Sequence, residues 1–214
     1  MQILIVDDET LFREGLRALM ESLDPRAKIQ AVADCNEALA ALQGTQFDVV
    51  LLDLNLPPLS HYEALDLLHA KAPEATIVAL SGTRNPDAMR ECVERGAAGF
   101  IVKTSSPRTL MNALRIVLAG GVYLPSEALA KHRTGPGHVI GPTATGARAT
   151  LTLRQLEVLG LVALGHQTSQ IATRLGIAEG TVKEHLESIF RALGVRTRAH
   201  AVFVAVRSGL IPLA

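Results

Sequence analysis

The stretch FDVVLLDLNLPP, residues 47–58, decides how the first half of this chain is interpreted. Its apolar run, residues 49–52, is short, β-branched at its start and free of polar alternation, which is typical of a parallel strand covered on both faces. Asp53 ends this run. In open α/β sheets, ligands bind outside the carboxyl ends of the strands, so a carboxylate at this position faces a site. We interpret Asp53 as a residue of a functional site, although Asp is also a common turn former.

A pattern of strand, loop and helix repeats along residues 1–121. Apolar runs typical of strands cover residues 3–6, 28–33, 49–53, 75–80 and 99–102, and apolar residues at helical spacing cover 10–20, 37–42, 61–71, 87–95 and 107–119. Five strands that alternate with five helices imply right-handed crossovers, and therefore an α/β domain with a doubly wound, five-stranded parallel sheet. The carboxyl ends of all these strands then meet at one edge.

Charge is divided unevenly along the chain, although its formal sum is +0. Residues 1–124 hold 11 basic and 16 acidic residues, a balance of −5, whereas residues 125–150 hold 3 and 1 and residues 151–214 hold 7 and 4, which gives +2 and +3. An acidic first half and a modestly basic second half predict two domains with different partners. The partner of the second domain is expected to be a polyanion.

Neither cysteine shows the spacing of a metal site or of a redox pair. Cys35 and Cys92 fall within predicted helices, so we interpret both as packing residues. Residues 2–6 lack the basic lead of a signal peptide, and every apolar run is shorter than the roughly 18 residues of a membrane span. We therefore expect a cytoplasmic protein that has no membrane partner.

Polar residues follow four of the predicted strands where their carboxyl ends meet. They are Asp7 and Asp8 after the first strand, Asp53 after the third, Ser81 after the fourth and Lys103 after the fifth. Three crowded carboxylates repel one another unless a cation offsets their charge, and Mg²⁺ suits oxygen ligands close to phosphate. Lys103 offers a point charge to a phosphoryl oxygen, and the Ser81 hydroxyl offers a hydrogen bond. The pattern predicts a carboxylate that accepts a phosphoryl group.

Residues 1–120 resemble the receiver domain of bacterial two-component response regulators, which has a flavodoxin-like fold. The features that match are the Asp7-Asp8 pair, Asp53 followed by Leu54 and Pro57, Ser81 in ALSG, and Lys103 at the end of GFIVK. The resemblance implies that Asp53 accepts phosphate from a phosphohistidine on a sensor histidine kinase. It also implies that the protein is a phosphoacceptor with possible autodephosphorylation rather than an enzyme.

The same resemblance assigns roles to residues around the phosphoacceptor. It implies that Asp8 binds Mg²⁺ directly, that Asp7 binds it through water, and that the backbone carbonyl of Asn55 completes the ligand set with Asp53. Phe100 matches the aromatic residue whose rotamer follows the serine at the end of the fourth strand.

Two residues depart from the receiver pattern in the loop after the third strand. His61 stands where the family usually has Gly, and Pro58 stands where Gly is common. Because Pro fixes φ near −65° and removes a donor, we expect this loop to take a less usual path and to affect the kinetics of phosphorylation.

Apolar periodicity fades between residues 122 and 149, where Gly and Pro accumulate. We interpret this segment as a linker, with a short helix over residues 126–131. Periodicity returns from residue 150, where Thr152 suits a helix N-cap. Further on, residues 169–175, 176–178 and 181–193 predict a helix, a turn with Gly and a second helix. Residues 150–214 are therefore predicted to form a smaller, all-α helix-turn-helix domain.

The second helix of such a motif enters the major groove of double-stranded DNA. Helical periodicity turns Gly180, Thr181, Lys183, Glu184, Glu187, Ser188 and Arg191 outward. Residues 151–211 resemble the LuxR/FixJ-type DNA-binding domain in LTLRQLEVL, IATRLGI, GTVKEH and LGVRTRA. The resemblance implies that Lys183 contacts DNA near the groove and that the last helix, rich in apolar residues, forms a homodimer contact. It also makes Arg191, Arg196 and Arg198 candidates for phosphate contacts.

These observations predict a response regulator in which phosphorylation of Asp53 controls dimerisation and DNA binding. Ser169 and Ala192 replace lysines that the DNA-binding family commonly has, which predicts weaker binding with a shallower salt dependence. Two alternatives stay open: a regulator that no longer needs phosphate, and a helical module for protein contacts. A phosphohydrolase of the haloacid dehalogenase type requires an acid two residues after the nucleophile, and Asn55 at that position cannot take this role.

Overall fold

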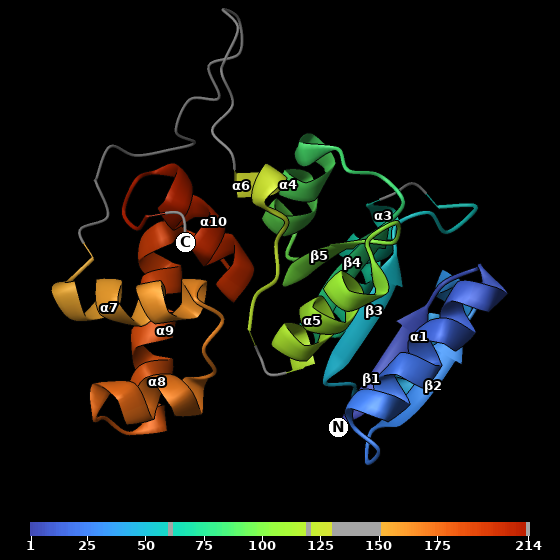
Figure 1. Ribbon diagram of the computed structural model, residues 1–214, viewed down its shortest axis with the longest axis horizontal. Helices are drawn as coiled ribbons and strands as arrows, with labels where there is room; N and C mark the ends of the chain where they lie inside the picture. Colours follow the sequence, from blue (N-terminus) through green and yellow to red (C-terminus); the bar gives the residue numbers. More distant parts are fainter. Residues whose placement is uncertain (60–61, 119–120, 130–150, 213–214) are drawn as a thin grey trace, which may run out of the picture.

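The computed structural model describes residues 1–59, 62–118, 121–129 and 151–212, and it consists of an α/β domain followed by a helical domain (Figure 1). Strands and helices alternate through the first domain. They are β1 (Gln2–Val6), α1 (Thr10–Leu23), β2 (Lys28–Val32), α2 (Cys35–Gly44), β3 (Val49–Asp53), α3 (Glu63–Lys71), β4 (Thr76–Ser81), α4 (Pro86–Glu94), β5 (Gly99–Val102) and α5 (Pro107–Leu118). The predicted strands and helices are confirmed, with bounds that differ by a few residues.

All neighbouring strands of the sheet pair in parallel, in the order β2-β1-β3-β4-β5. In the register of the sheet, Val6 lies opposite Leu52, and Asp53 lies opposite Leu80. This arrangement confirms the predicted doubly wound sheet. It also brings the carboxyl ends of β1, β3, β4 and β5 to the same level, because parallel strands in register end along one edge.

Helices cover both faces of the sheet, so β3 is buried along its whole length. Val49 and Leu51 pack on one face with residues of α1 and α5, and Val50 and Leu52 pack on the other with residues of α2, α3 and α4. This two-sided burial explains why the strand is a continuous apolar run instead of an alternating one. Cys35 and Cys92 are buried free cysteines in α2 and α4, which confirms them as packing residues.

Part of the predicted linker packs on the α/β domain. Tyr123 forms a parallel bridge with Gly99, and its carbonyl accepts a hydrogen bond from the Phe100 backbone N–H at 2.9 Å. A short helix, α6 (Ser126–Leu129), then brings the buried side chain of Ala128 into the core on the α4 side of the sheet. The rest of the predicted linker, together with His61, lies outside the described residues.

The helical domain contains α7 (Leu153–Ala163), α8 (Thr168–Leu175), α9 (Glu179–Leu193) and α10 (Arg198–Arg207) around its own apolar core. Thr152 caps α7 as predicted, because its side chain accepts a hydrogen bond from the Gln155 backbone N–H. Gly176 has φ +63° and ends α8 in a left-handed conformation that favours glycine. The predicted helix-turn-helix is therefore formed by α8 and α9. None of the helices described is long and apolar enough to cross a membrane.

Helix α10 packs against α4 and α6, between the two domains (Figure 1). Phe203 and Ala199 of α10 are buried against Val93 of α4, and half-buried Val122, Leu124 and Val204 pack around them. We call these six residues the interdomain cluster. The apolar face of the last helix, expected to meet a partner chain, is covered by the chain's own α/β domain, and this packing removes Phe203 from water.

Candidate functional site

The polar residues predicted to meet at the strand ends do so. Asp7 directly follows β1, Asp53 ends β3, and Lys103 directly follows β5. The Lys103 ammonium lies 2.8 Å from Asp53 Oδ2 and 2.9 Å from Asp7 Oδ2. A single cation therefore joins two carboxylates that reach it from different strands.

Asp53 is almost completely enclosed, with 1% of its surface exposed. Its Oδ2 accepts a hydrogen bond from Lys103, and its Oδ1 accepts one from the Asn55 backbone N–H at 3.0 Å. Both oxygens thus point at donors while the carboxylate stays at the edge of the sheet. The role of the Asn55 carbonyl as a metal ligand stays a prediction.

Lys103 carries a stable positive charge. Burial opposes that charge, but the contacts with the carboxylates of Asp53, Glu9 and Asp7 together raise the pKa of the Lys103 ammonium above its ordinary value. Its side chain is only 9% exposed. The cation is therefore retained at any physiological pH and is available to pair with an incoming anion.

The acidic residues are suited to a divalent cation. Ligand oxygens of Asp7, Asp8 and Asp53 lie within 4.8 Å of one another. Asp7 Oδ2 is buried, and its ion pair with Lys103 lacks the geometry of a hydrogen bond, whereas Asp8 is exposed to water. Burial, together with the charge of Asp53, raises the pKa of Asp7 even though Lys103 and the Glu9 backbone N–H lower it. A hard cation that keeps several waters fits carboxylates arranged in this way.

Ser81 borders a hollow on the other side of the phosphoacceptor. This hollow has a volume of about 420 Å³ and is lined by Asn55, Ser81 and Thr83, among others. Ser81 is buried, and its hydroxyl oxygen accepts a hydrogen bond from the Thr83 backbone N–H at 3.2 Å. Phe100 is fully buried in the core on the same face as α4. Its predicted rotamer switch stays a prediction.

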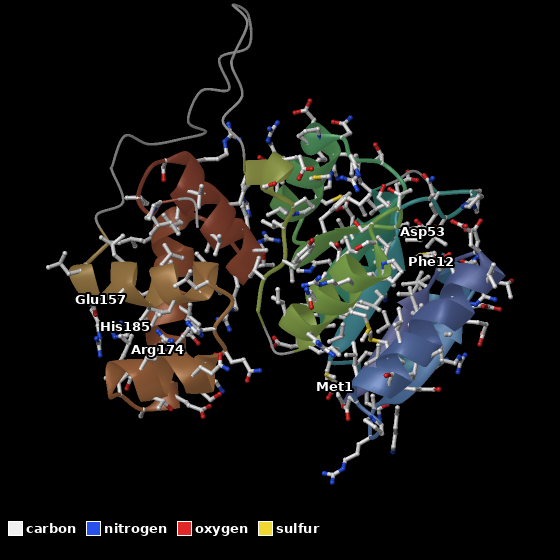
Figure 2. All side chains as sticks on the ribbon, viewed as in Figure 1. Met1, Phe12, Asp53, Glu157, Arg174 and His185 are labelled. Atoms are coloured by element: carbon white, nitrogen blue, oxygen red, sulfur yellow. The ribbon has the colours of Figure 1, made fainter. Side chains whose placement is uncertain are left out.

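Two contacts of Lys103 were missed by reasoning from the sequence. The Glu9 carboxylate accepts a hydrogen bond from Lys103 at 2.7 Å, and the Phe12 ring centroid lies 4.7 Å from the ammonium nitrogen. Figure 2 shows Phe12 on α1 beside Asp53. Glu9 directly follows the Asp7-Asp8 pair and could have been included for that reason. Phe12 carried no signal beyond the apolar face of a helix.

The predicted DNA-reading face belongs to α9. Among its candidate residues, Lys183, Glu184, Glu187 and Arg191 are exposed, and Thr181 and Ser188 are half-buried. The exposed group is confirmed as outward-facing, and its contact with DNA is a matter for proposal. The hydroxyl of Ser188 is occupied within the domain, since it accepts a hydrogen bond from the Gln155 side chain at 2.9 Å.

The two remaining arginine candidates lie in different surroundings. The Arg198 guanidinium is half-buried and donates to the His166 backbone carbonyl at 2.8 Å, and burial lowers its pKa. Arg198 therefore ties α10 to the loop before α8, and its contact with phosphate stays a prediction. Arg196 is exposed and lines a cleft of about 370 Å³ that also contains Asp66 and Glu94 of the α/β domain. Its side chain thus lies beside the other domain.

Comparison with known proteins agrees with this division of the chain. The family model described as response regulator receiver domain matches residues 3–115, and that of the luxR family of bacterial regulatory proteins matches residues 149–205. The chain is 30% identical to the transcriptional regulatory protein LnrK of Bacillus subtilis, with 98% of each chain covered. It is 33% identical to the nitrate/nitrite response regulator protein NarP of Escherichia coli, with 95% of this chain and 93% of the relative covered.

Solved structures show the same folds. A LuxR-family two-component response regulator from Aurantimonas is 30% identical, with a TM-score of 0.54 over 59% of this chain and 91% of that chain. The RcsB response regulator of Salmonella typhimurium, with a TM-score of 0.54 and 20% identity, covers 98% of this chain and 97% of its own and shares the fold. Another RcsB structure is described as two dimers bound to two parallel DNAs.

The acidic cluster predicts that a divalent cation stabilises the folded chain. MgCl₂ should raise the unfolding temperature, since a ligand at a hundredfold excess over its Kd adds about 2.7 kcal/mol to stability. Asp8→Asn should remove most of this gain, whereas Asp48→Asn, just before β3 at the opposite edge of the sheet, should retain it. Differential scanning calorimetry would measure both. An undiminished gain in Asp8→Asn would contradict the assignment.

Proposed function

Because the chain belongs to the two-component response regulators that join a receiver domain to a LuxR-type DNA-binding domain, we propose that Asp53 accepts a phosphoryl group from a sensor histidine kinase and thereby controls DNA binding. The observation that carries this proposal is the 2.8 Å contact between Lys103 and the enclosed carboxylate of Asp53. The chain is a transcription regulator, and we propose that it works in the cytoplasm, where it reaches DNA.

In the proposed transfer, a carboxylate oxygen of Asp53 attacks the phosphorus of a phosphohistidine. A P–O bond forms, the P–N bond breaks, and the imidazole nitrogen leaves with the electron pair and takes a proton from water. Lys103 pairs with one oxygen of the transferred group, and the Ser81 hydroxyl donates to another. Water later hydrolyses the acyl phosphate to inorganic phosphate and restores Asp53, so the chain is not expected to turn over a separate substrate.

We propose Mg²⁺ as the cation of the acidic cluster. Asp7, Asp8, Asp53 and the Asn55 carbonyl would hold it, and it would supply positive charge to the transferred phosphoryl group. Asp8 and the buried Asp7 Oδ2 give the cluster an open and an enclosed side, which allows the ion to keep its waters. Without a cation, three carboxylates within 4.8 Å of one another would repel the incoming dianion.

The interdomain cluster joins the receiver domain to the DNA-binding domain. Phe203 is 2% exposed and packs against Val93, so this face of α10 is unavailable to a second copy while the domains stay together. Arg196 lines the adjoining cleft together with Asp66, Glu94 and Arg95 of the receiver. We propose that phosphorylation favours separated domains, which frees α10 for a dimer and Arg196 for phosphates.

The recognition helix α9 would then read DNA as one half of a dimer. Lys183 lies in the second turn of α9, on the exposed face, where residues reach base edges in this motif. Glu184 and Glu187 share that face and can accept hydrogen bonds from cytosine, although they also repel phosphates. Nonspecific affinity should therefore be modest, and sequence preference should depend on few side chains.

Replacing the phosphoacceptor tests the transfer. Asp53→Ala should abolish labelling by acetyl phosphate in the presence of Mg²⁺, because no carboxylate remains to form the acyl phosphate. A Phos-tag gel would detect the adduct, and excess EDTA should abolish it in the wild-type chain. Asp48→Ala, at the other end of β3, serves as the matched control. Equal labelling of Asp53→Ala and wild type would contradict the proposal. DNA binding that is the same before and after phosphorylation would support a phosphate-independent regulator.

Disrupting the contact between the two domains tests the proposal that this contact prevents dimerisation and DNA binding. Val93→Asp places a charge in the interdomain cluster and should favour separated domains, so that dimers and DNA complexes form without phosphate, at least about tenfold more tightly, equivalent to about 1.4 kcal/mol. Light scattering and fluorescence anisotropy would measure both. Leu67→Asp adds the same charge to half-exposed Leu67 on α3, outside the cluster, and should have no such effect. Unchanged dimerisation of Val93→Asp would contradict the proposal that the domain contact prevents dimer formation.

A substitution on α9 tests DNA reading. Lys183→Ala should cost about 1–3 kcal/mol at one base position if this side chain reads a base, and should weaken binding evenly across sequences if it contacts phosphate. Glu187→Ala should strengthen nonspecific binding while loosening sequence preference, because it removes a charge that repels phosphate. Anisotropy of residues 145–214 on a cognate and a scrambled duplex at two salt concentrations separates these outcomes. No binding to either duplex at low salt would instead identify a protein-interaction module.

A further inference from the structure

Lys103 is held on more than one side at the strand edge. Three carboxylates surround its ammonium nitrogen. Those of Glu9 and Asp53 accept hydrogen bonds from it at 2.7 and 2.8 Å, and that of Asp7 forms an ion pair with it at 2.9 Å. The ring of Phe12 lies over the same nitrogen, 4.7 Å from centroid to Nζ. This distance is within the roughly 6 Å at which the negative face of an aromatic ring attracts a cation.

The position of Phe12 is set by the start of α1. The Arg13 side chain donates a hydrogen bond to the Asp7 backbone carbonyl at 2.5 Å, and the Arg13 backbone N–H donates to the Glu9 carbonyl at 2.9 Å. The first turn of α1 is therefore tied to the end of β1. Phe12 is half-buried and packs against the core beneath α1, so its ring has a defined place beside the ammonium.

The partners of Lys103 differ in what happens to them on phosphoryl transfer. Asp53 becomes the acyl phosphate, and Glu9, whose side chain is 64% exposed, can exchange its hydrogen bond for water at little cost. The Phe12 ring is displaced by neither change, because it is attached to the core rather than to the reacting group. Together with the buried carboxylate of Asp7, it is therefore a contact that can hold Lys103 both before and after transfer.

We infer that Phe12 is a positioning residue that holds the Lys103 ammonium over the phosphoacceptor through its ring face and keeps water from that side of the cation. This inference rests on the proposed function, in which Lys103 pairs with the transferred phosphoryl group. Phe12 would otherwise be interpreted as a packing residue only. Holding the Lys103 ammonium in this way requires an aromatic ring and not merely an apolar side chain.

Phosphorylation rates of Phe12 variants test the inference. Phe12→Leu should slow labelling by acetyl phosphate about two- to fivefold, which corresponds to the lower end of the range for cation–π contacts, and Phe12→Tyr should retain the rate because it keeps the ring face. Mono-, di- and trifluorinated phenylalanine at position 12 should slow labelling stepwise, since fluorine withdraws charge from the ring face while keeping its shape. Phe47→Leu, a buried phenylalanine packed on the opposite face of the sheet, is the matched control for loss of a ring.

A spectroscopic measurement locates the ring without any phosphodonor. The chain has five lysines, so selective ¹³C labelling of their ε-carbons gives few signals, which single Lys→Arg variants assign. The ring current of Phe12 should displace the Lys103 ε-proton signal upfield in the wild-type chain, and Phe12→Leu should return it to the ordinary position. Phe47→Leu should leave it displaced.

Several results would overturn the inference. An undisplaced Lys103 signal, or one that Phe12→Leu leaves unchanged, would show that the ring does not cover the cation. Rates that fall with leucine but not with fluorination would show that Phe12 only fills space. If the wild-type chain accepts no phosphate at all, the proposed function fails, and the NMR signal alone then decides whether Phe12 holds Lys103.

Discussion

The contact between the Lys103 ammonium and the carboxylates of Asp7, Glu9 and Asp53 is the interaction on which the acidic edge of the sheet depends. Like charges this close would resist ionisation, and the ammonium offsets them from the end of a different strand. The contact requires β1, β3 and β5 to end at one level. The parallel sheet is therefore a condition for the chemistry of the site.

A continuous set of contacts leads from this edge to the DNA-binding domain. The Lys103 backbone N–H donates to the Ser81 carbonyl at 2.7 Å, which fixes the end of β5 to the end of β4. At its other end, β5 bridges through Gly99 to Tyr123, whose neighbours Val122 and Leu124 belong to the interdomain cluster. Strand β5 thus precedes Lys103 at one end and, at the other, pairs with the segment around Tyr123 that packs against α10. This gives the proposed control a physical route through packed elements.

The DNA-binding domain has its own core, and its two partner surfaces are in different states. The exposed face of α9 presents Lys183 and Arg191 together with Glu184 and Glu187, so attraction to phosphate is partly offset by repulsion. Helix α10 instead has its apolar face buried against the receiver. Under the proposed regulation, α10 would be covered and α9 open, so the protein would make only weak, single contacts with DNA until the domains separate.

The sequence by itself determined the strands, the parallel sheet, the strand-end site around Asp53 and the helix-turn-helix, because periodicity and strand-end position are local properties of the chain. Only the tertiary structure decided that Glu9 and Phe12 contact Lys103, that Arg198 turns into its own domain, and that α10 is covered. A helical pattern shows which residues are apolar but not which neighbour buries them. The orientation of the Arg198 side chain and the packing partner of Phe203 depend on contacts between residues far apart in the chain. Such contacts produce no periodic pattern in the sequence.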